Sequence, residues 1–248
     1  MPILSGKIAL VTGASRGIGR ASALALAAAG AQVLIHYGRG AKEAETVVEQ
    51  IRQAGGRADA VGMDLGDPEG PHKLAKRVRD IIGGHVDILI ANAGIAKAAT
   101  IEETTIADFD RMFAVNVRAP FFLVQQVLPI MSNGGSIVFV SSRAAQWAVG
   151  SISAYAATKG AIDTIVKHFA SVLGPRGIRV NAVAPGIVET DMSNFARTDA
   201  GREFALGMQA IKRLAQPDDI GPVVAFLASD DARWITGDTM RVDGGSRL

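Results

Sequence analysis

A short apolar run followed by three glycines constrains the fold of this chain more than any other feature. Residues 8–11 have the composition of a buried parallel strand, and residues 20–29 are rich in Ala and Leu, which favour helix. Gly13, Gly17 and Gly19 lie between these two runs. Glycines at such a turn allow backbone angles that side chains forbid, and they let a pyrophosphate approach the amides at a helix N-terminus. This placement favours a dinucleotide-binding turn over an ordinary tight turn.

Strands and helices alternate along the rest of the chain. The further predicted strands are 32–36, 57–63, 86–91, 136–140, 178–184 and 239–242. The predicted helices are 41–54, 67–83, 106–131 with a kink at Pro120, 153–173 and 217–228. The pattern predicts one α/β domain over residues 1–248, a Rossmann-type doubly wound parallel sheet with helices on both faces. We expect about seven strands in the order 3-2-1-4-5-6-7. Residues 190–216 lack a steady period and are predicted to form an irregular lid over the substrate.

The composition excludes several classes of function. The chain is 48% hydrophobic and its formal net charge is only +2, which indicates a globular protein without a nucleic-acid footprint. It has no cysteine, so thiolate catalysis and cysteine metal sites are excluded, and the spacing of its four histidines predicts no metal site. We find no signal peptide and no apolar run that we expect to span a bilayer. A cytoplasmic protein without a membrane partner is therefore expected.

Tyr155, Lys159 and Ser142 suggest acid–base chemistry beyond the carboxyl ends of the strands, where ligands bind in such sheets. Tyr155 and Lys159 are four residues apart, which places them on one face of a helix. A phenol with a pKa near 10 is a poor acid or base, and a nearby ammonium is expected to lower that pKa. Ser142 ends a strand, where its hydroxyl can meet the same substrate oxygen. The alternative to a catalytic pair is a half-buried tyrosine beside a solvated lysine. The presence of Ser142 and the glycine turn makes this alternative less favoured.

The chain resembles the short-chain dehydrogenase/reductase family in the order and separation of its motifs over residues 7–245. These motifs are Thr12-Gly-x3-Gly-Ile-Gly19, Asn92-Ala-Gly94, Asn116, Ser142, Tyr155-x3-Lys159 and Pro185-Gly186. The separation of Ser142 from Tyr155 selects Ser142 over Ser141. Ala91 stands where many members have an asparagine, a departure that concerns strand packing more than chemistry.

The resemblance implies four catalytic residues. Tyr155 would exchange a proton with the substrate oxygen, and Lys159 would bind the nicotinamide ribose and lower the pKa of the phenol. Ser142 would orient the carbonyl. Asn116 would hold a backbone kink and a water of the proton relay. Together with the glycine turn, the predicted cofactor-binding residues are Gly13, Ser15, Arg16, Gly17, Ile18, Gly19, Tyr37, Arg39, Asp64, Leu65, Asn92, Ala93, Gly94, Tyr155, Lys159, Pro185, Gly186, Ile187, Val188 and Thr190.

The end of the second strand predicts the cofactor. An NAD site usually places a carboxylate about twenty residues past the glycine turn. Tyr37 occupies that position, followed by Gly38 and Arg39. Arg16 and Arg39 can receive a 2′-phosphate, and Arg16 is the stronger candidate because Arg39 lies in a flexible Gly-Arg-Gly. We therefore expect NADP(H), with NAD(H) as the less favoured alternative.

The predicted function is reduction of a ketone, or oxidation of a secondary alcohol in reverse. Ser142, Tyr155 and Trp147 are predicted to line the substrate pocket, with the side chain of Arg143 pointing away. A 3-oxoacyl-carrier-protein reductase is one alternative, ranked lower because the turn at 129–135 has no basic residue to bind an acidic carrier. A non-catalytic dinucleotide sensor is the other. Extra apolar stripes on the helices 106–131 and 153–173 predict a homo-oligomer, and the resemblance implies a homotetramer.

Overall fold

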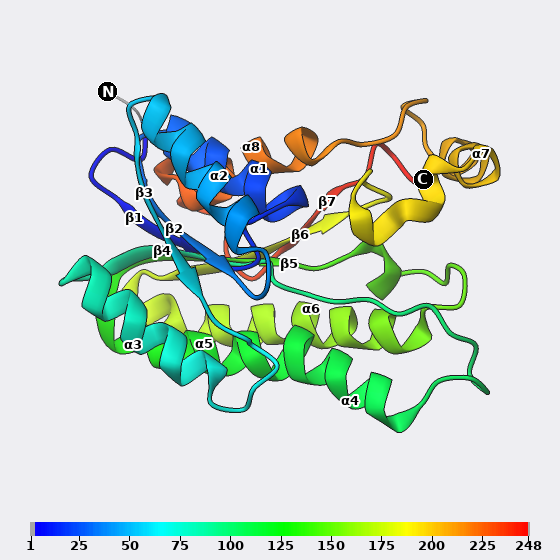
Figure 1. Ribbon diagram of the computed structural model, residues 1–248, viewed down its shortest axis with the longest axis horizontal. Coiled ribbons are helices and arrows are strands. Elements are labelled where there is room, and N and C mark those ends of the chain that lie inside the picture. The colour runs from blue at the N-terminus through cyan, green and yellow to red at the C-terminus, as the bar shows by residue number, and fades with distance from the viewer. Residues whose placement is uncertain (1–2, 248) are drawn as a thin grey trace.

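The computed structural model describes residues 3–247 and confirms the predicted sheet (Figure 1). Seven parallel strands follow the order β3-β2-β1-β4-β5-β6-β7. The strands are β1 (Ile8–Val11), β2 (Gln32–Tyr37), β3 (Arg57–Gly62), β4 (Val86–Ala91), β5 (Met131–Val140), β6 (Arg179–Pro185) and β7 (Thr239–Val242). Their order reverses at β1, whose neighbours are β2 and β4, so the carboxyl ends of β1 and β4 flank the position where such sheets bind dinucleotides.

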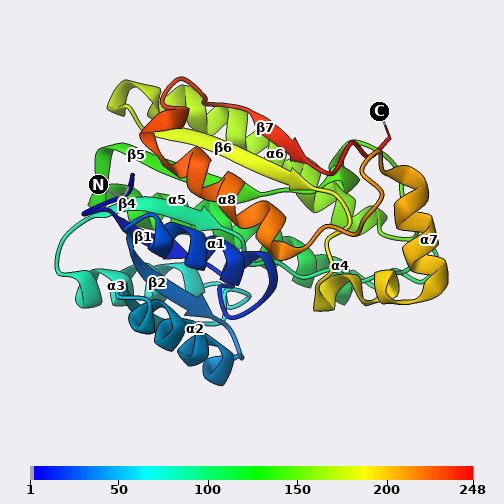
Figure 2. The same ribbon diagram turned by 90° about the horizontal axis from the view of Figure 1, so that it is seen from above.

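Helices cover both faces of the sheet (Figures 1 and 2). One face carries α1 (Gly17–Ala28), α2 (Ala41–Gln53) and α8 (Pro217–Ala228). The other carries α3 (Gly70–Ile82), α4 (Ile106–Phe113), α5 (Ala119–Val127) and α6 (Ser153–Leu173). Successive residues of a strand point to opposite faces, so Ala9 and Val11 join the core under α1 while Leu10 joins the core on the other side.

The long helix after β4 contains an irregular turn just before the proline that was predicted to kink it. α4 ends at Phe113, and residues Ala114–Arg118 form one π-helical turn before α5 begins. Pro120 follows this turn directly, inside the continuous helical stretch 106–130, where it lacks the N–H that would bond a carbonyl of the preceding turn. The predicted irregularity therefore takes the form of a π turn that contains Asn116 and immediately precedes Pro120.

The same stretch corrects the expectation about apolar runs. Its helical residues 106–130 are long and apolar enough to cross a membrane, judged by length and composition alone. The core helix of a domain passes the same test, and here α5 packs against α3 and buries Leu123 and Val127.

Residues 190–216, predicted to be irregular, contain a helix, so that part of the expectation was wrong, while the role of this segment as a lid stays a prediction. After a 3-10 segment, Asp191–Arg197, the chain forms α7 (Asp199–Met208). Thr198 caps α7, since its Oγ1 accepts a hydrogen bond from the N–H of Gly201 at 3.1 Å. Ala196, Ala205 and Leu214 form a small core of their own. Such small apolar residues give a weak helical period, which is why the sequence pattern missed α7.

Candidate active site

The structure brings three of the four predicted catalytic residues together at the carboxyl end of β5. Ser142 follows β5, and a hydrogen bond joins it to Tyr155 on α6. Lys159 lies one turn further along α6, with its Nζ 5.6 Å from the centre of the Tyr155 ring. The same Nζ donates a hydrogen bond to the Val140 carbonyl at 2.7 Å. A phenol, a hydroxyl and an ammonium thus share one small volume.

Burial governs the charges of this group. It raises the pKa of the Tyr155 phenol, and the hydrogen bond with Ser142 opposes that rise. Burial also lowers the pKa of Lys159 to about 8, opposed by the carboxylate of Asp163. Burial is the largest influence on the Tyr155 phenol, which is neutral at pH 7. The lowering effect of Lys159 on the pKa of that phenol stays a prediction.

Asn116 holds the backbone near this group. Its Oδ1 accepts a hydrogen bond from the N–H of Ile95 at 2.8 Å, and its Nδ2 donates to the Ile95 carbonyl at 2.8 Å. The Nδ2 also donates to Thr158 Oγ1 at 3.1 Å. A Cβ placed on Gly94 would lie 3.3 Å from Asn116 Oδ1 and 3.7 Å from Lys159 Nζ. Asn116 and Gly94 therefore border the ammonium of Lys159, which links the predicted proton relay to the predicted cofactor site.

The glycine turn is braced by side chains from a neighbouring strand. Asn92 Nδ2 donates to the carbonyls of Thr12 and Gly13 at 2.8 and 3.1 Å. The backbone N–H groups of Asn92 and Ala93 both donate to Thr12 Oγ1 at 3.0 Å. A Cβ on Gly19 would lie 2.2 Å from the Gly13 carbonyl oxygen, so only glycine fits there. The predicted cofactor residue Asn92 thus uses its amide to shape the turn.

Sequence reasoning missed His36 as a functional residue. It is only 2% exposed, at the end of β2, and its Nδ1 accepts a hydrogen bond from the N–H of Gly13 at 3.1 Å. The proton is therefore on Nε2, which donates to the Met63 carbonyl at 3.0 Å. Burial lowers the pKa of His36 to about 4, so the ring is neutral near pH 7. The available signal was a histidine inside an otherwise apolar strand.

The two arginines proposed for a 2′-phosphate have different surroundings. Arg16 reaches across to the start of the lid, where its Nη1 lies 3.3 Å from Asp191 Oδ2 in an exposed ion pair. Arg39 is exposed and follows β2, with no ion pair of its own to a carboxylate within the described residues 3–247. Asp64, predicted to border the adenine, accepts from the Gly66 N–H and from Arg111, and these contacts lower its pKa. Arg111, on α4, was not predicted. The structure therefore does not join Arg16 to Arg39.

The remaining predicted cofactor residues lie along the same edge of the sheet. Thr190 approaches the glycine turn, since a Cβ on Gly17 would lie 3.4 Å from its methyl group. Gly186, after β6, packs against Asp243, which would lie 3.1 Å from an added Cβ. The Tyr37 ring covers Gly62 of the neighbouring strand. Ser15 lies near Gly40, and Ala93 packs against Gly13. Leu65 is buried, while Ile18 and Ile187 pack at the edges of two apolar cores. Pro185 ends β6, and Val188 forms an isolated parallel bridge with Ala215.

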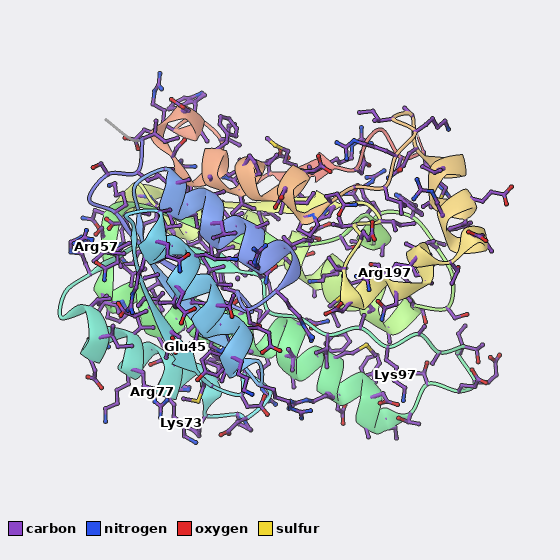
Figure 3. All side chains as sticks on the ribbon, turned by 45° about the horizontal axis from the view of Figure 1, so that its top comes forward. Glu45, Arg57, Lys73, Arg77, Lys97 and Arg197 are labelled. Atoms are coloured by element: carbon purple, nitrogen blue, oxygen red, sulfur yellow. The ribbon has the colours of Figure 1, made fainter. Side chains whose placement is uncertain are left out.

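Trp147 and Arg143 follow Ser142 in a loop that the end of the chain covers. Arg143 was predicted to point away, but it is buried, and its Nε lies 2.7 Å from Asp243 Oδ2. The guanidinium of Arg247 lies 4.5 Å from the centre of the Trp147 ring, and that of Arg143 lies 5.9 Å from it. On the lid, Arg197 (Figure 3) lies 3.8 Å from both Glu189 and Asp191. Within residues 3–247, no cluster of side chains suited to a metal ion occurs.

Comparisons with known proteins extend over nearly the whole chain. A family model described as enoyl-(acyl carrier protein) reductase matches residues 13–247. Versicolorin reductase 1 of Aspergillus parasiticus is 42% identical over 256 residues, which cover 98% of this chain and 97% of that protein. Hydroxynaphthalene reductase-like protein Arp2 of Metarhizium robertsii is 40% identical over 257 residues, covering 98% and 96%.

Solved structures agree with these matches. The angucycline C-6 ketoreductase LanV with bound NADP has a TM-score of 0.94 and 44% identity, and the match covers 99% of this chain and 97% of that chain. The landomycin C-6 ketoreductase LanV with bound NADP and rabelomycin has a TM-score of 0.90 and 43% identity, with 99% and 98% covered.

Proposed function

Since the chain belongs to the short-chain dehydrogenase/reductase family, we propose that it reduces a ketone on a fused-ring substrate with NADPH. It is an NADP(H)-dependent oxidoreductase. One observation carries the reaction type. The hydroxyl of Ser142 is near enough to the phenol of Tyr155 to lower its pKa, and both lie beyond the carboxyl end of β5, so both can meet a single carbonyl oxygen.

The residues fit the cofactor. Gly13, Gly17 and Gly19 leave the amides at the start of α1 uncovered, and Gly94 leaves room beside Lys159 Nζ. NADPH, when bound there, supplies the hydride that adds to the carbonyl carbon. Lys159 would hold the nicotinamide ribose, and Gly186 and Thr190 would border the nicotinamide half.

In the direction of reduction, Ser142 donates a hydrogen bond that orients the carbonyl oxygen. Tyr155 gives its proton to that oxygen as the carbon–oxygen π bond breaks, and the product is a secondary alcohol. Asn116 donates a hydrogen bond to Thr158 and holds the backbone beside Lys159. A water at this place can return a proton to Tyr155. Tyr155 is protonated at neutral pH, as a proton donor requires. Burial makes it a weaker acid, which the hydrogen-bonding side chain of Ser142 opposes and the ammonium of Lys159 would oppose further.

The substrate class rests on the relatives. Hydroxynaphthalene, in the name of one relative, is a skeleton of two fused aromatic rings that bears a hydroxyl group. LanV is a ketoreductase whose structure holds rabelomycin. Trp147, five residues after Ser142, is the residue predicted to line the pocket, where its ring would give a fused-ring substrate an aromatic surface.

An acyl-carrier-protein substrate is the second candidate, which the description of the family model favours. An acidic carrier protein needs free basic side chains. Arg176 donates to Asn133 and to the carbonyls of Leu128 and Met131, while Arg179 is buried and donates to Leu227 and Ser229. Because both arginines are committed to internal bonds, the ring-ketone substrate is the better supported of the two.

The test is oxidation of NADPH, followed with 1-tetralone and, separately, with acetoacetyl- and crotonyl-acyl carrier protein. We expect turnover with 1-tetralone and little with either carrier substrate. Faster turnover of a carrier substrate would replace the proposal with the second candidate. No turnover of any ketone, despite tight NADPH binding, would favour a dinucleotide sensor.

We also propose a cytoplasmic homotetramer. Phe121 and Phe122 are about one third exposed on α5, beside a groove of about 550 Å³ lined by these rings and by Phe113 and Val117. Val124 and Val127 of the same helix are buried in the core, so the unpartnered stripe is narrower than the sequence suggested. Sedimentation at micromolar concentration tests this assembly, and a monomer would end the proposal.

A further inference from the structure

Four buried polar side-chain atoms in the segments that contact the end of the chain make no well-directed hydrogen bond. Among residues 3–247, these are Arg143 Nε, Trp147 Nε1, Gln209 Oε1 and Asp243 Oδ2, and we call these four residues the polar cluster. Buried polar groups are rarely left unpaired, because the bonds lost to water are not replaced. Two of the four, Arg143 Nε and Asp243 Oδ2, lie within ion-pair distance of each other, so Trp147 Nε1 and Gln209 Oε1 are the atoms that point to a group which the protein itself does not provide.

Two members of the polar cluster neutralise each other. Arg143 Nε lies 2.7 Å from Asp243 Oδ2, so the pair leaves no net charge. What remains is one donor, the indole N–H of Trp147, and one acceptor, the side-chain oxygen of Gln209. Gln209 is only 3% exposed, and it directly follows α7, on the lid.

The end of the chain holds this donor and this acceptor in one frame. The carbonyls of Gly245 and Gly244 accept from the N–H groups of Ala210 and Ile211 at 3.2 and 3.0 Å. The backbone N–H of Arg247 donates to the Met208 carbonyl at 2.9 Å. The residues on both sides of Gln209 are thus hydrogen-bonded to the C-terminal segment, which fixes the backbone at Gln209.

Arg247 extends the same frame to Trp147. Its guanidinium lies over the indole ring, and its Nη1 donates to the Ala148 carbonyl at 3.4 Å. Figures 1 and 2 both show the end of the chain beside α7. The frame also adjoins the proposed chemistry, because Arg143 follows Ser142 and Asp243 packs against Gly186.

We propose that Trp147 and Gln209 form a subsite for a hydroxyl group of the substrate, set apart from the carbonyl that is reduced. A hydroxyl accepts a hydrogen bond from the indole N–H and donates one to the amide oxygen, which satisfies both atoms. A carboxylate would face the oxygens of Gln209 and Asp243, and an ammonium would face the N–H of Trp147 and the guanidinium of Arg143. A neutral hydroxyl, such as a phenol, fits where neither charged group does. This inference rests on the proposed function and deepens it, since it adds a hydroxyl to the ring ketone.

The test compares 1-tetralone with its series of monohydroxy derivatives. We expect the wild type to prefer at least one hydroxylated ketone by about tenfold in kcat/KM. Gln209→Met should remove most of that preference and leave kcat/KM for 1-tetralone within about twofold of the wild type. Trp147→Phe also alters the pocket wall, so it should lower kcat/KM for both kinds of ketone, and more for the hydroxylated one. Gln53→Met and Trp234→Phe are the matched controls, because Gln53 is exposed on α2 and Trp234 is 97% exposed.

The outcomes separate this inference from the proposed function. Equal reduction of 1-tetralone and all its derivatives by the wild type would overturn the subsite and leave the ketoreductase standing. Equal losses on both kinds of ketone in the variants would reduce the two residues to a structural role. If the wild type reduces none of these ketones, the proposed function fails, and calorimetric binding of 2-naphthol to the protein with NADP⁺ tests the subsite alone. Affinity unchanged by Gln209→Met would then overturn it.

Discussion

The glycine turn and the substrate loops meet at one edge of the sheet, yet they are built in opposite ways. At the glycine turn, Thr12, His36 and Asn92 all direct hydrogen bonds within the protein, and His36 and Thr12 are buried. The substrate side has exposed ion pairs at Asp191 and, in the polar cluster, buried atoms with no partner.

This difference assigns two tasks to two regions. A cofactor common to many reactions is bound by a preformed backbone, whose shape is fixed by contacts among strands β1, β2 and β4. On the proposed function, the segments after β5 and β6 would select the substrate, whose groups would complete theirs. Variants in each region show whether the two tasks separate in this way.

Removing the phenol should abolish the chemistry and spare the cofactor. Tyr155→Phe keeps the ring but loses the proton donor, and general acid catalysis typically contributes about 10²–10⁴-fold. We expect kcat to fall by about that factor while the Kd for NADPH, measured by fluorescence titration, stays unchanged. A variant that retains most of its kcat would show that another group donates the proton.

The braced glycine turn should weaken in acid through His36. Its pKa is about 4 in the folded protein, against an ordinary value of 6.5, so the fold favours the neutral ring. The contribution of His36 to the free energy of unfolding, about 3 kcal/mol, is fully present above about pH 6.5 and is lost as the pH falls toward 4. Urea unfolding between pH 7 and 4 measures it.

His36→Gln should flatten that part of the pH dependence, whereas His168→Gln, at an exposed position on α6, should preserve it. Identical pH profiles for the wild type and His36→Gln would refute the role of His36.

Crowding the turn should cost cofactor affinity. In Gly19→Ala the new Cβ would meet the Gly13 carbonyl and the Asn92 amide, and overpacking of this kind costs about 1–3 kcal/mol. We expect the Kd for NADPH to rise about 10–100-fold. Gly160→Ala is the control: an added Cβ at that position on α6 has no neighbour within 4 Å, so affinity should not change. Equal behaviour of the two variants would mean that the turn is not preformed.

Cofactor choice should depend on Arg16, which links the two regions. A hydrogen bond to a charged group is worth roughly 1.5–3 kcal/mol. Arg16 forms an exposed ion pair with Asp191, which it can give up at little cost for a 2′-phosphate. We expect Arg16→Ala to lower kcat/KM with NADPH about tenfold and to leave kcat/KM with NADH unchanged. Asp191→Asn should keep the NADPH preference. A wild type that prefers NADH would show that the end of β2 was misinterpreted.

The two regions also differ in how far the sequence predicts them. The strands, the glycine turn and the pairing of Tyr155 with Lys159 follow from local periods and spacings, and the structure confirms the sheet order. The roles of the site residues remain predictions. His36, the ion pair of Arg143 with Asp243 and the position of Gln209 depend on contacts between distant segments, which no local pattern encodes. The burial that raises the pKa of Tyr155 likewise depends on the folded surroundings.

Hydrogen–deuterium exchange measured with and without NADP⁺ and a hydroxylated tetralone tests the separation of the two regions most directly. The backbone amides of residues 12–14 and 92–93 should be protected already in the free protein, because each donates a hydrogen bond to an acceptor within the protein. The protection gained on binding the ketone should be concentrated in residues 143–150 and 190–209. Rapid exchange at 12–14 in the free protein, with no change in the substrate segments on ketone binding, would contradict it.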